Sequence, residues 1–198
     1  MQKKTKNSYP EILHTLLVLC KKDDRRAIQQ LYEMCFPVFM PICRRYHNND
    51  DDARSSYNNG LLKIVNGLKK VEEQLNFWPW AKRIIVNTLI DEYRKRKIFD
   101  RHILTKETER ELDAYKHVVV NDAEDQLNIQ QIMKLIESLP ETTRLVFNLY
   151  AIEGYNHREI FEKTGLPEGT SKWHLSMARK ILIEKIQLIE NQYQKQII

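Results

Sequence analysis

The chain is short of glycine and proline, with 5 and 6 of them among 198 residues. These two residues supply most of the tight turns that an all-β protein needs, so their scarcity argues against that class. Good or tolerated helix formers dominate instead, among them lysine, glutamate, leucine and glutamine. With 42% hydrophobic residues, the composition predicts an all-α globular protein that can bury one core or two small ones.

Cysteine is equally scarce. The chain holds three, Cys20, Cys35 and Cys43, and no two of them have CxxC spacing. An odd number without that spacing indicates neither a disulfide framework nor a zinc motif. We expect buried free thiols in a reducing cytosol.

Long hydrophobic runs are missing. The longest, near residues 16–20, is far shorter than the roughly 20 apolar residues that span a bilayer. The first residues also lack the charged segment, apolar segment and cleavage site of a secretory leader. We therefore expect a cytoplasmic protein with no membrane insertion.

The amino-acid sequence shows no recognisable catalytic motif. No metal-ligand cluster, phosphate-binding loop, nucleophile–base pair or paired carboxylate stands out. The six histidines are scattered, and surface or capping roles are the default for each. The sequence therefore predicts no enzyme, no cofactor and no metal ion.

Charge is unevenly distributed along the chain. The net charge of +5 is an excess that solubility alone could explain. Residues 98–125, however, hold four basic and eight acidic residues, so this stretch carries −4 and the rest of the chain +9. We interpret 98–125 as an acidic, flexible linker. The predicted organisation is an N-terminal extension with a first helix (1–21), a helical domain (22–97), the linker (98–125) and a second helical domain (126–198).

Helical periodicity marks three helices in the first domain. Apolar residues recur at helical spacing from Asp24 to Tyr46, where Pro37 and Pro41 are expected to interrupt or restart the helix. Two more helices are predicted at 52–71 and 76–97. In the second domain, the spacing predicts a helix over 129–136, and Ser138–Glu141 is typical of a capping box that starts the next.

The segment after Gly154 has the pattern of a helix-turn-helix. Asn156–Thr164 is a short predicted helix capped by Asn156, Gly165–Pro167 is a turn, and a second helix begins at Glu168. Such a pair places one face of its second helix in a DNA groove that is about 12 Å wide.

Helical phase predicts which face of that second helix points outward. Leu175, Ala178 and Leu182 share one stripe and are expected to point inward, and Ser171 lies on the same stripe. Donors of hydrogen bonds or positive charge lie on the opposite side, which suits duplex DNA. The predicted outward residues are Lys172, Trp173, Ser176, Arg179 and Lys180. An ordinary helical hairpin with a solvated basic face remains the alternative.

The stretch FWPWAKRIIVNTLIDEYRKRK, residues 77–97, joins aromatic and basic residues on one predicted helix. Six positive residues stand against Asp91 and Glu92. Single-stranded nucleic acid offers phosphates to lysine and arginine and unstacked bases to aromatic rings. The amide of Asn87 could read a base edge. For Trp80 and Ile85 a place in the hydrophobic core is the stronger interpretation.

Two long segments together resemble a known family. LYEMCFPVFMPICRRYHNNDDDA, followed by residues 77–97, resembles region 2 of the sigma-70 family of RNA polymerase sigma factors. LPETTRLVFNLYAIEGYNHREIFEKTGLPEGTSKWHLSMARKIL is similar to region 4 of that family. Both regions, in this order and joined by a variable linker, are typical of the small extracytoplasmic-function (ECF) group.

The resemblance implies three binding surfaces. The first domain would capture the minus-10 promoter element as a melted single strand, and the second would read the minus-35 element as duplex. The residues implied for the minus-10 strand are Asn87, Tyr93, Arg94, Lys95, Arg96 and Lys97. Those implied for the minus-35 duplex are Thr170, Lys172, Trp173, Ser176, Arg179 and Lys180. Those implied for binding to the polymerase are Asp52, Asn58, Asn59 and Lys63.

The partners implied by the resemblance are core RNA polymerase, promoter DNA and an anti-sigma factor. The polymerase would contribute the clamp coiled coil of its largest subunit and its flap, and the acidic linker would run through the RNA exit path. Two segments depart from the family pattern. Arg54–Gly60 lacks the usual acidic and glutamine positions that face polymerase, and Ser171 replaces an aliphatic residue.

Three rival interpretations stay open at the level of sequence. A helix-turn-helix regulator would bind duplex DNA alone, usually as a dimer, but it has no reason to carry residues 77–97. A nucleic-acid-processing enzyme would need a catalytic carboxylate cluster. A sigma-like protein that has lost activity would explain the unusual Arg54–Gly60 segment.

Overall fold

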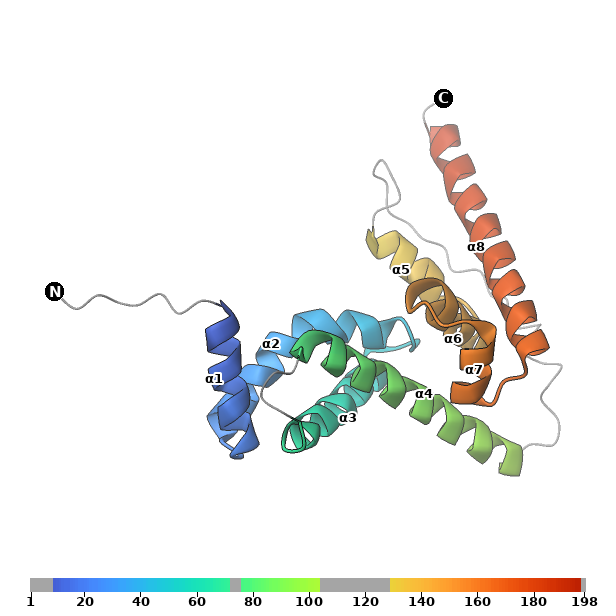
Figure 1. The fold of residues 1–198 in the computed structure, drawn as a ribbon. Helices are drawn as coiled ribbons and strands as arrows, with labels where there is room; N and C mark the ends of the chain where they lie inside the picture. Colours follow the sequence, from blue (N-terminus) through green and yellow to red (C-terminus); the bar gives the residue numbers. More distant parts are fainter. Residues whose placement is uncertain (1–8, 72–75, 104–128, 197–198) are drawn as a thin grey trace. The chain divides into compact units, whose positions relative to one another are not determined.

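The computed structural model describes residues 9–71, 76–103 and 129–196 (Figure 1). Every regular element within these ranges is helical, which confirms the predicted all-α fold. In chain order the elements are α1 (Tyr9–Lys21), α2 (Arg25–Arg44), α3 (Asp50–Leu68), α4 (Phe77–Ile103), α5 (Ile129–Glu137), α6 (Glu141–Phe147), the π-helix η2 (Asn148–Ile152), α7 (His157–Thr164) and α8 (Glu168–Gln196). Of the predicted linker, residues 104–125 lie outside the described ranges.

Contacts divide the chain into two compact units. The first unit comprises Met1–Cys43 and Ala53–Thr88, and the second comprises Arg44–Asp52 and Leu89–Ile198. In the first unit the core lies between α1, α2, α3 and the first half of α4. No described helix is both long enough and apolar enough to cross a membrane.

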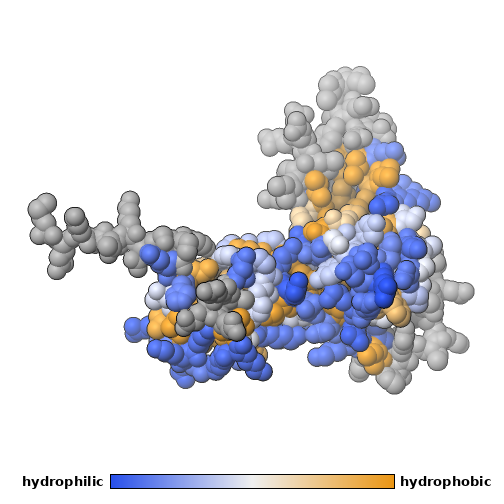
Figure 2. All heavy atoms as spheres, in the orientation of Figure 1, coloured by the Kyte–Doolittle hydropathy of each residue, from blue (hydrophilic) through white to orange (hydrophobic). Residues whose placement is uncertain are grey.

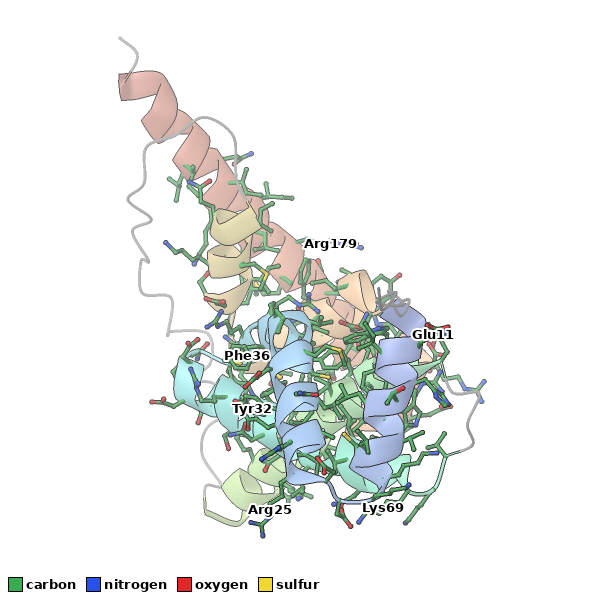
Figure 3. All side chains as sticks on the ribbon, turned by 90° about the vertical axis from the view of Figure 1, so that its left-hand side faces the viewer. Glu11, Arg25, Tyr32, Phe36, Lys69 and Arg179 are labelled. Atoms are coloured by element: carbon green, nitrogen blue, oxygen red, sulfur yellow. The ribbon has the colours of Figure 1, made fainter. Side chains whose placement is uncertain are left out.

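Tyr57 of α3 is the largest fully buried side chain of the first unit. Its hydroxyl donates to the backbone carbonyl of Tyr32 at 2.7 Å, which satisfies the only polar atom of the side chain. Its ring meets the rings of Tyr32 and Phe36 edge-on, at centroid distances of 5.1 and 5.3 Å. Figure 3 shows Tyr32 and Phe36 on the same helix, α2.

The two prolines of α2 do not break the helix, so the predicted interruption is wrong. α2 runs without a gap from Arg25 to Arg44, with Pro37 and Pro41 inside it. Both prolines are exposed, so the carbonyl groups that lose their N–H partners can bond to water. The buried face of the helix, which includes Leu31 and Phe39, is packed continuously and holds the helix together.

Two glycines let α3 and α4 approach closely within the first unit. A Cβ atom on Gly60 would lie 2.5 Å from Cδ1 of Ile85, and one on Gly67 would lie 2.9 Å from Cζ2 of Trp80. Gly60 and Gly67 are seven residues apart and therefore share one face of α3. Ile85 is fully buried, so its side chain has little freedom to move aside.

Replacing Gly60 by valine is expected to lower the free energy of unfolding by about 2 kcal/mol, because the new methyl groups occupy the space of Ile85. Chemical denaturation measures this loss in the free energy of unfolding. The matched control is Gly169→Val, since no atom lies within 4 Å of a Cβ at that exposed helical glycine. Adding Ile85→Ala to Gly60→Val should recover stability, with a coupling of about 1 kcal/mol or more. Strict additivity of the two changes would contradict the close-contact explanation.

The core of the second unit includes Leu139, which precedes α6, and Ala178 and Ile181 of α8. Phe147, Met177 and Leu182 pack against this cluster and are partly buried. Figure 2 shows hydrophobic atoms gathered over α5 and α8, where Ile132, Ile183 and Leu188 are exposed.

Two helix boundaries differ from prediction, one at the start of α6 and one at the end of α4. The capping box at Ser138–Glu141 is wrong, because the N-cap of α6 is Pro140 and no side chain caps it. The Ser138 hydroxyl instead donates to the carbonyl of Leu135 at 2.7 Å and accepts a bond from Lys185 Nζ at 2.6 Å. Helix α4 also continues to Ile103, six residues into the stretch predicted as linker.

All three cysteines are free and buried, as predicted. Burial raises the pKa of the Cys20 thiol to about 11 and that of Cys35 to about 12. These two thiols are therefore protonated at neutral pH and are weak nucleophiles.

Candidate nucleic-acid interface

Helices α7 and α8 form the helix-turn-helix that the sequence predicts. The Asn156 side chain accepts a hydrogen bond from the N–H of Glu159 at 2.9 Å, and the Glu159 carboxylate accepts one from the N–H of Asn156 at 2.8 Å. This capping box was predicted and is confirmed. Gly165 ends α7 with φ 75°, a left-handed conformation that glycine adopts without strain. The turn is thereby set by local chemistry alone.

Hydrogen bonds between histidine and hydroxyl side chains attach the start of α8 to its neighbours. Ser171 is fully buried, and its Oγ lies 2.9 Å from Nδ1 of His157 on α7. His174 is also buried, and its Nδ1 lies 2.9 Å from Oγ1 of Thr143 on α6. The serine that replaces the family's aliphatic residue therefore has a polar partner. Neither pair follows from a sequence pattern, because 14 and 31 positions separate the partners.

Burial, together with the nearby cation of Lys172, lowers the pKa of His157. Arg179 lowers this pKa further, whereas Glu168 raises it. The imidazole is therefore neutral at pH 7 and can accept or donate one hydrogen bond at Nδ1, according to its tautomer. The ring also stacks on Tyr150 at a centroid distance of 4.7 Å, which fixes its orientation.

The outward face of α8 is exposed, as helical phase predicts. Leu175 and Ala178 are buried and Leu182 is half-buried, while the opposite side of the helix is open to solvent. The exposed residues, which we call the α8 face, are Thr170, Lys172, Trp173, Ser176, Arg179 and Lys180. Trp173 is 47% exposed and touches only the edge of the His174 ring among the described aromatic pairs. Figure 3 marks Arg179 on α8.

The aromatic start of α4 belongs to the core of the first unit. Phe77 is buried, and Trp78 and Trp80 are half-buried against it, at centroid distances of 5.2 and 6.2 Å. Ile85 is fully buried. A place in the hydrophobic core is therefore the better interpretation for Trp80 and Ile85 than contact with nucleic acid. The aromatic rings at this end of α4 pack against one another. Asn87, further along the helix, is half-buried.

The basic end of α4 is partly covered within the second unit. Arg94 and Lys95 are exposed. Tyr93, in contrast, is only 5% exposed, and its hydroxyl lies 3.1 Å from Oγ1 of Thr142. Arg96 and Lys97 both face one carboxylate, that of Glu141, at 3.0 and 3.9 Å. Of the six residues predicted for a single strand, three are exposed (Arg94, Lys95 and Arg96), Asn87 and Lys97 are half-buried, and only Tyr93 is buried.

The predicted polymerase-binding residues lie exposed on α3. Asn58, Asn59 and Lys63 project from the helix, and Asp52, also exposed, accepts a bond from Nδ2 of Asn49 at 2.8 Å. Arg54 is exposed as well, with its guanidinium 5.7 Å from the centroid of the Phe36 ring. From Ala53 to Leu68 the helix has no carboxylate.

Two family models match the chain. "Sigma-70 region 2" matches residues 31–98, and "Sigma-70, region 4" matches residues 129–182. The two matches contain the α4 residues and the α8 face described above.

Curated relatives match nearly the whole chain. RNA polymerase sigma factor SigV of Bacillus subtilis is 27% identical, over 87% of this chain and 91% of its own length. ECF RNA polymerase sigma factor SigW of the same organism is 25% identical, over 84% and 92%. The ECF RNA polymerase sigma-E factor of Escherichia coli is 24% identical, over 84% and 90%.

Among solved structures, CnrH in complex with the cytosolic domain of CnrY has 17% identity and a TM-score of 0.44, covering 88% of this chain and 97% of that one. With regions 2 and 4 both matched, and with relatives of this kind along most of its length, the chain belongs to the sigma-70 family of RNA polymerase sigma factors, in the ECF group, and acts in promoter-specific initiation of transcription.

Proposed function

We propose that the protein reads the minus-35 element as duplex through the α8 face and captures the minus-10 element as a melted strand through α4. The observation that supports this most directly is the α8 face itself. A complete helix-turn-helix holds it in place, and its three cations and one tryptophan are exposed. The domain limits 22–97 and 126–198 remain predictions.

The α8 face suits the major groove of duplex DNA. Lys172, Ser176 and Arg179 recur at i, i+4 and i+7 and therefore form a line along the helix. Arginine bonds guanine through two donors, lysine and serine bond phosphates, and an apolar side chain can contact the thymine methyl group. Trp173 and Lys180 flank this line, so the face combines base-reading and phosphate-binding groups.

The basic end of α4 suits a single strand. Arg94 and Lys95 offer charge to phosphates, and the amide of Asn87 can donate to and accept from a base edge. The ring of Tyr93 is the one aromatic group in the predicted set, and it would stack on an unpaired base once exposed.

The free-energy cost of opening the promoter duplex requires a large partner. Opening about ten base-pair steps costs on the order of 14 kcal/mol, at about 1.4 kcal/mol for each step. One stacked base returns only about 1–3 kcal/mol. Core polymerase therefore has to supply most of the stabilisation, and we propose that Asp52, Asn58, Asn59 and Lys63 on α3 bind its clamp coiled coil. The flap as a second contact, and an anti-sigma factor as inhibitor, belong to the same proposal.

One feature favours a second candidate, a sigma-like protein that no longer activates polymerase. The described α3 lacks carboxylates from Ala53 to Leu68, where the family pattern has acidic positions. Arg54 stands on this exposed surface instead.

Run-off transcription separates the two candidates. Purified protein and its cognate core polymerase are incubated with a pool of genomic fragments, and transcripts are mapped at their start sites. We expect discrete start sites that depend on the protein. Arg94→Ala should reduce strand opening, measured as permanganate reactivity of thymines, while leaving binding to the upstream duplex intact. Failure to direct polymerase to any start site would remove the proposed function and leave the inactive candidate.

A further inference from the structure

His157 borders the α8 face, but it belongs to α7 and is absent from the set predicted to read duplex DNA. Figure 1 shows α7 beside the first part of α8. His157 is the first residue of α7, and its Nδ1 lies 2.9 Å from Oγ of Ser171, the residue before Lys172. This hydrogen bond fixes the imidazole next to a cation of the α8 face.

The imidazole of His157 is held at Nδ1 and on one ring face, and it is open at Nε2. The Tyr150 ring stacks on it at a centroid distance of 4.7 Å and an interplanar angle of 23°. Ser171, itself fully buried, occupies Nδ1. Within residues 9–71, 76–103 and 129–196, Nε2 forms no hydrogen bond and is not among the buried polar atoms that lack a partner. The histidine is half-buried, so Nε2 is available to a ligand from solvent.

Two cations of the α8 face repel a positive charge on this imidazole. Burial lowers the pKa of His157, and Lys172 and Arg179 lower it further, whereas Glu168 at the start of α8 raises it. Neither Lys172 nor Arg179 forms an ion pair with another described residue. The three groups therefore form a site whose positive charges lack a compensating anion.

The charged side chains that follow His157 on α7 are engaged elsewhere. Nε of Arg158 donates to the Glu162 carboxylate at 3.3 Å, and the Glu159 carboxylate accepts from the N–H of Asn156 at 2.8 Å. From η2, the group that faces the imidazole is the phenol ring of Tyr150. The charge state of His157 is therefore governed by α8 and by whatever binds to it.

A duplex on the α8 face brings an anion to this site. In a helix-turn-helix the second helix lies in the major groove while the first crosses the DNA backbone. A phosphate that pairs with Lys172 or Arg179 removes the repulsion that keeps the imidazole neutral, and its own charge attracts the imidazolium. The protonated ring donates from both nitrogens, so Nδ1 can donate to Ser171 while Nε2 donates to the phosphate.

Ser171 allows this change of charge without loss of the contact between α7 and α8. A hydroxyl group both donates and accepts, so it bonds to a neutral Nδ1 and to a protonated one alike. An aliphatic side chain at this position would leave Nδ1 without a partner against α8. That loss would destabilise the imidazolium most, because a charged group has the larger desolvation penalty.

We propose that His157 is a phosphate-binding residue of the minus-35 interface, oriented by Ser171, which takes up a proton from solvent when duplex DNA binds. This inference rests on the proposed function, because it adds a residue of α7 to the α8 face. The complex holds more protons than the free protein at pH values between the pKa of His157 in the free protein and its higher pKa in the complex. Affinity therefore rises as pH falls through this interval and is constant on either side of it.

The test measures the affinity of the full-length protein, bound to core polymerase, for a minus-35 duplex that the wild type selects from a random library. Measurements at pH 6 and pH 8 bracket the ordinary histidine pKa of about 6.5. The wild type should bind about fivefold more tightly at pH 6. His157→Gln can still bond to Ser171 but cannot carry charge. It should match the wild type at pH 8 within about twofold and lose the gain at pH 6.

Two further variants complete the comparison. His157→Arg carries a permanent cation and should bind at pH 8 about as tightly as the wild type does at pH 6, with no pH dependence of its own. His14→Gln, which makes the same chemical change at an exposed site on α1, is the matched control and should keep the pH dependence of the wild type.

Titration calorimetry in two buffers of different ionisation enthalpy measures proton uptake directly. At about pH 6.5 the wild type should take up about 0.5 proton more on binding than His157→Gln or His157→Arg. Equal uptake by the three proteins would overturn the inference. So would a loss of affinity in His157→Gln that is the same at both pH values, because a purely structural role predicts that result.

Arg179→Ala, measured at pH 8, separates the inference from the proposed function. If Arg179→Ala weakens duplex binding and His157→Gln leaves the pH dependence unchanged, the inference is wrong and the proposed function stands. If duplex binding responds to neither variant at either pH, the proposed function is wrong as well.

Discussion

Replacing Arg179 by alanine is expected to reduce the affinity of the polymerase-bound protein for minus-35 duplex by about 5- to 150-fold, which corresponds to about 1–3 kcal/mol. Arg179 lies at the centre of the exposed α8 face, on the same line as Lys172 and Ser176. Duplex binding is measured at several salt concentrations, on a template that the wild type selects from a random library. If Arg179 contacts a phosphate, the plot of log binding constant against log salt concentration should also become less steep, by about 0.9.

The matched control for Arg179→Ala is Arg26→Ala, which removes the same charge from an exposed position on α2. Because long-range attraction alone would respond to either change, only a contact with DNA distinguishes them. We expect Arg26→Ala to change duplex affinity less than about twofold. Equal effects of the two variants would show that the α8 face does not read the duplex.

Replacing Leu139 by alanine should lower the free energy of unfolding of the second unit by about 3 kcal/mol. Leu139 is 2% exposed and contacts the buried cluster that contains Ala178 and Ile181 of α8. Truncation leaves a cavity that a closely packed core cannot fill. The midpoint of thermal unfolding should fall by about 10 °C, measured by calorimetry.

Ile183→Ala is the control for this second prediction. It removes an aliphatic side chain of similar size from the same helix, at a position that is 54% exposed. Its effect should stay within about 0.5 kcal/mol. Because Ala178 is next to Arg179 in the sequence, the Leu139→Ala protein should also bind duplex DNA less well near its unfolding midpoint. Equal stability of the two variants would refute the proposed core.

Local chemistry made the helix-turn-helix predictable. The Asn156 cap, the reciprocal bond of Glu159 and the left-handed Gly165 all involve residues within a few positions of one another. The outward face of α8 followed from helical phase, because the side chains of a regular helix point in directions set by the backbone. The same local reasoning failed at Ser138, where the backbone at Pro140 turns without any side-chain cap.

Contacts between distant residues were beyond reach of the sequence. Ser171 and His157 are separated by fourteen positions, and Tyr93 and Thr142 by forty-nine. Neither spacing is a motif, so no pattern could pair them. Pro37 and Pro41 illustrate the same limit. Whether a proline breaks a helix depends on the side of the helix it occupies, and packing decides which side is buried.

The amino-acid order by itself therefore determined the helical class, the family and the two segments that carry the nucleic-acid residues, since propensity, periodicity and capping act over a few neighbouring residues. Only the tertiary structure decided which of those residues are exposed to solvent and which are buried or paired. Glu141 reaches Arg96 because folding places α6 beside α4 within the second unit, and no local rule encodes that proximity.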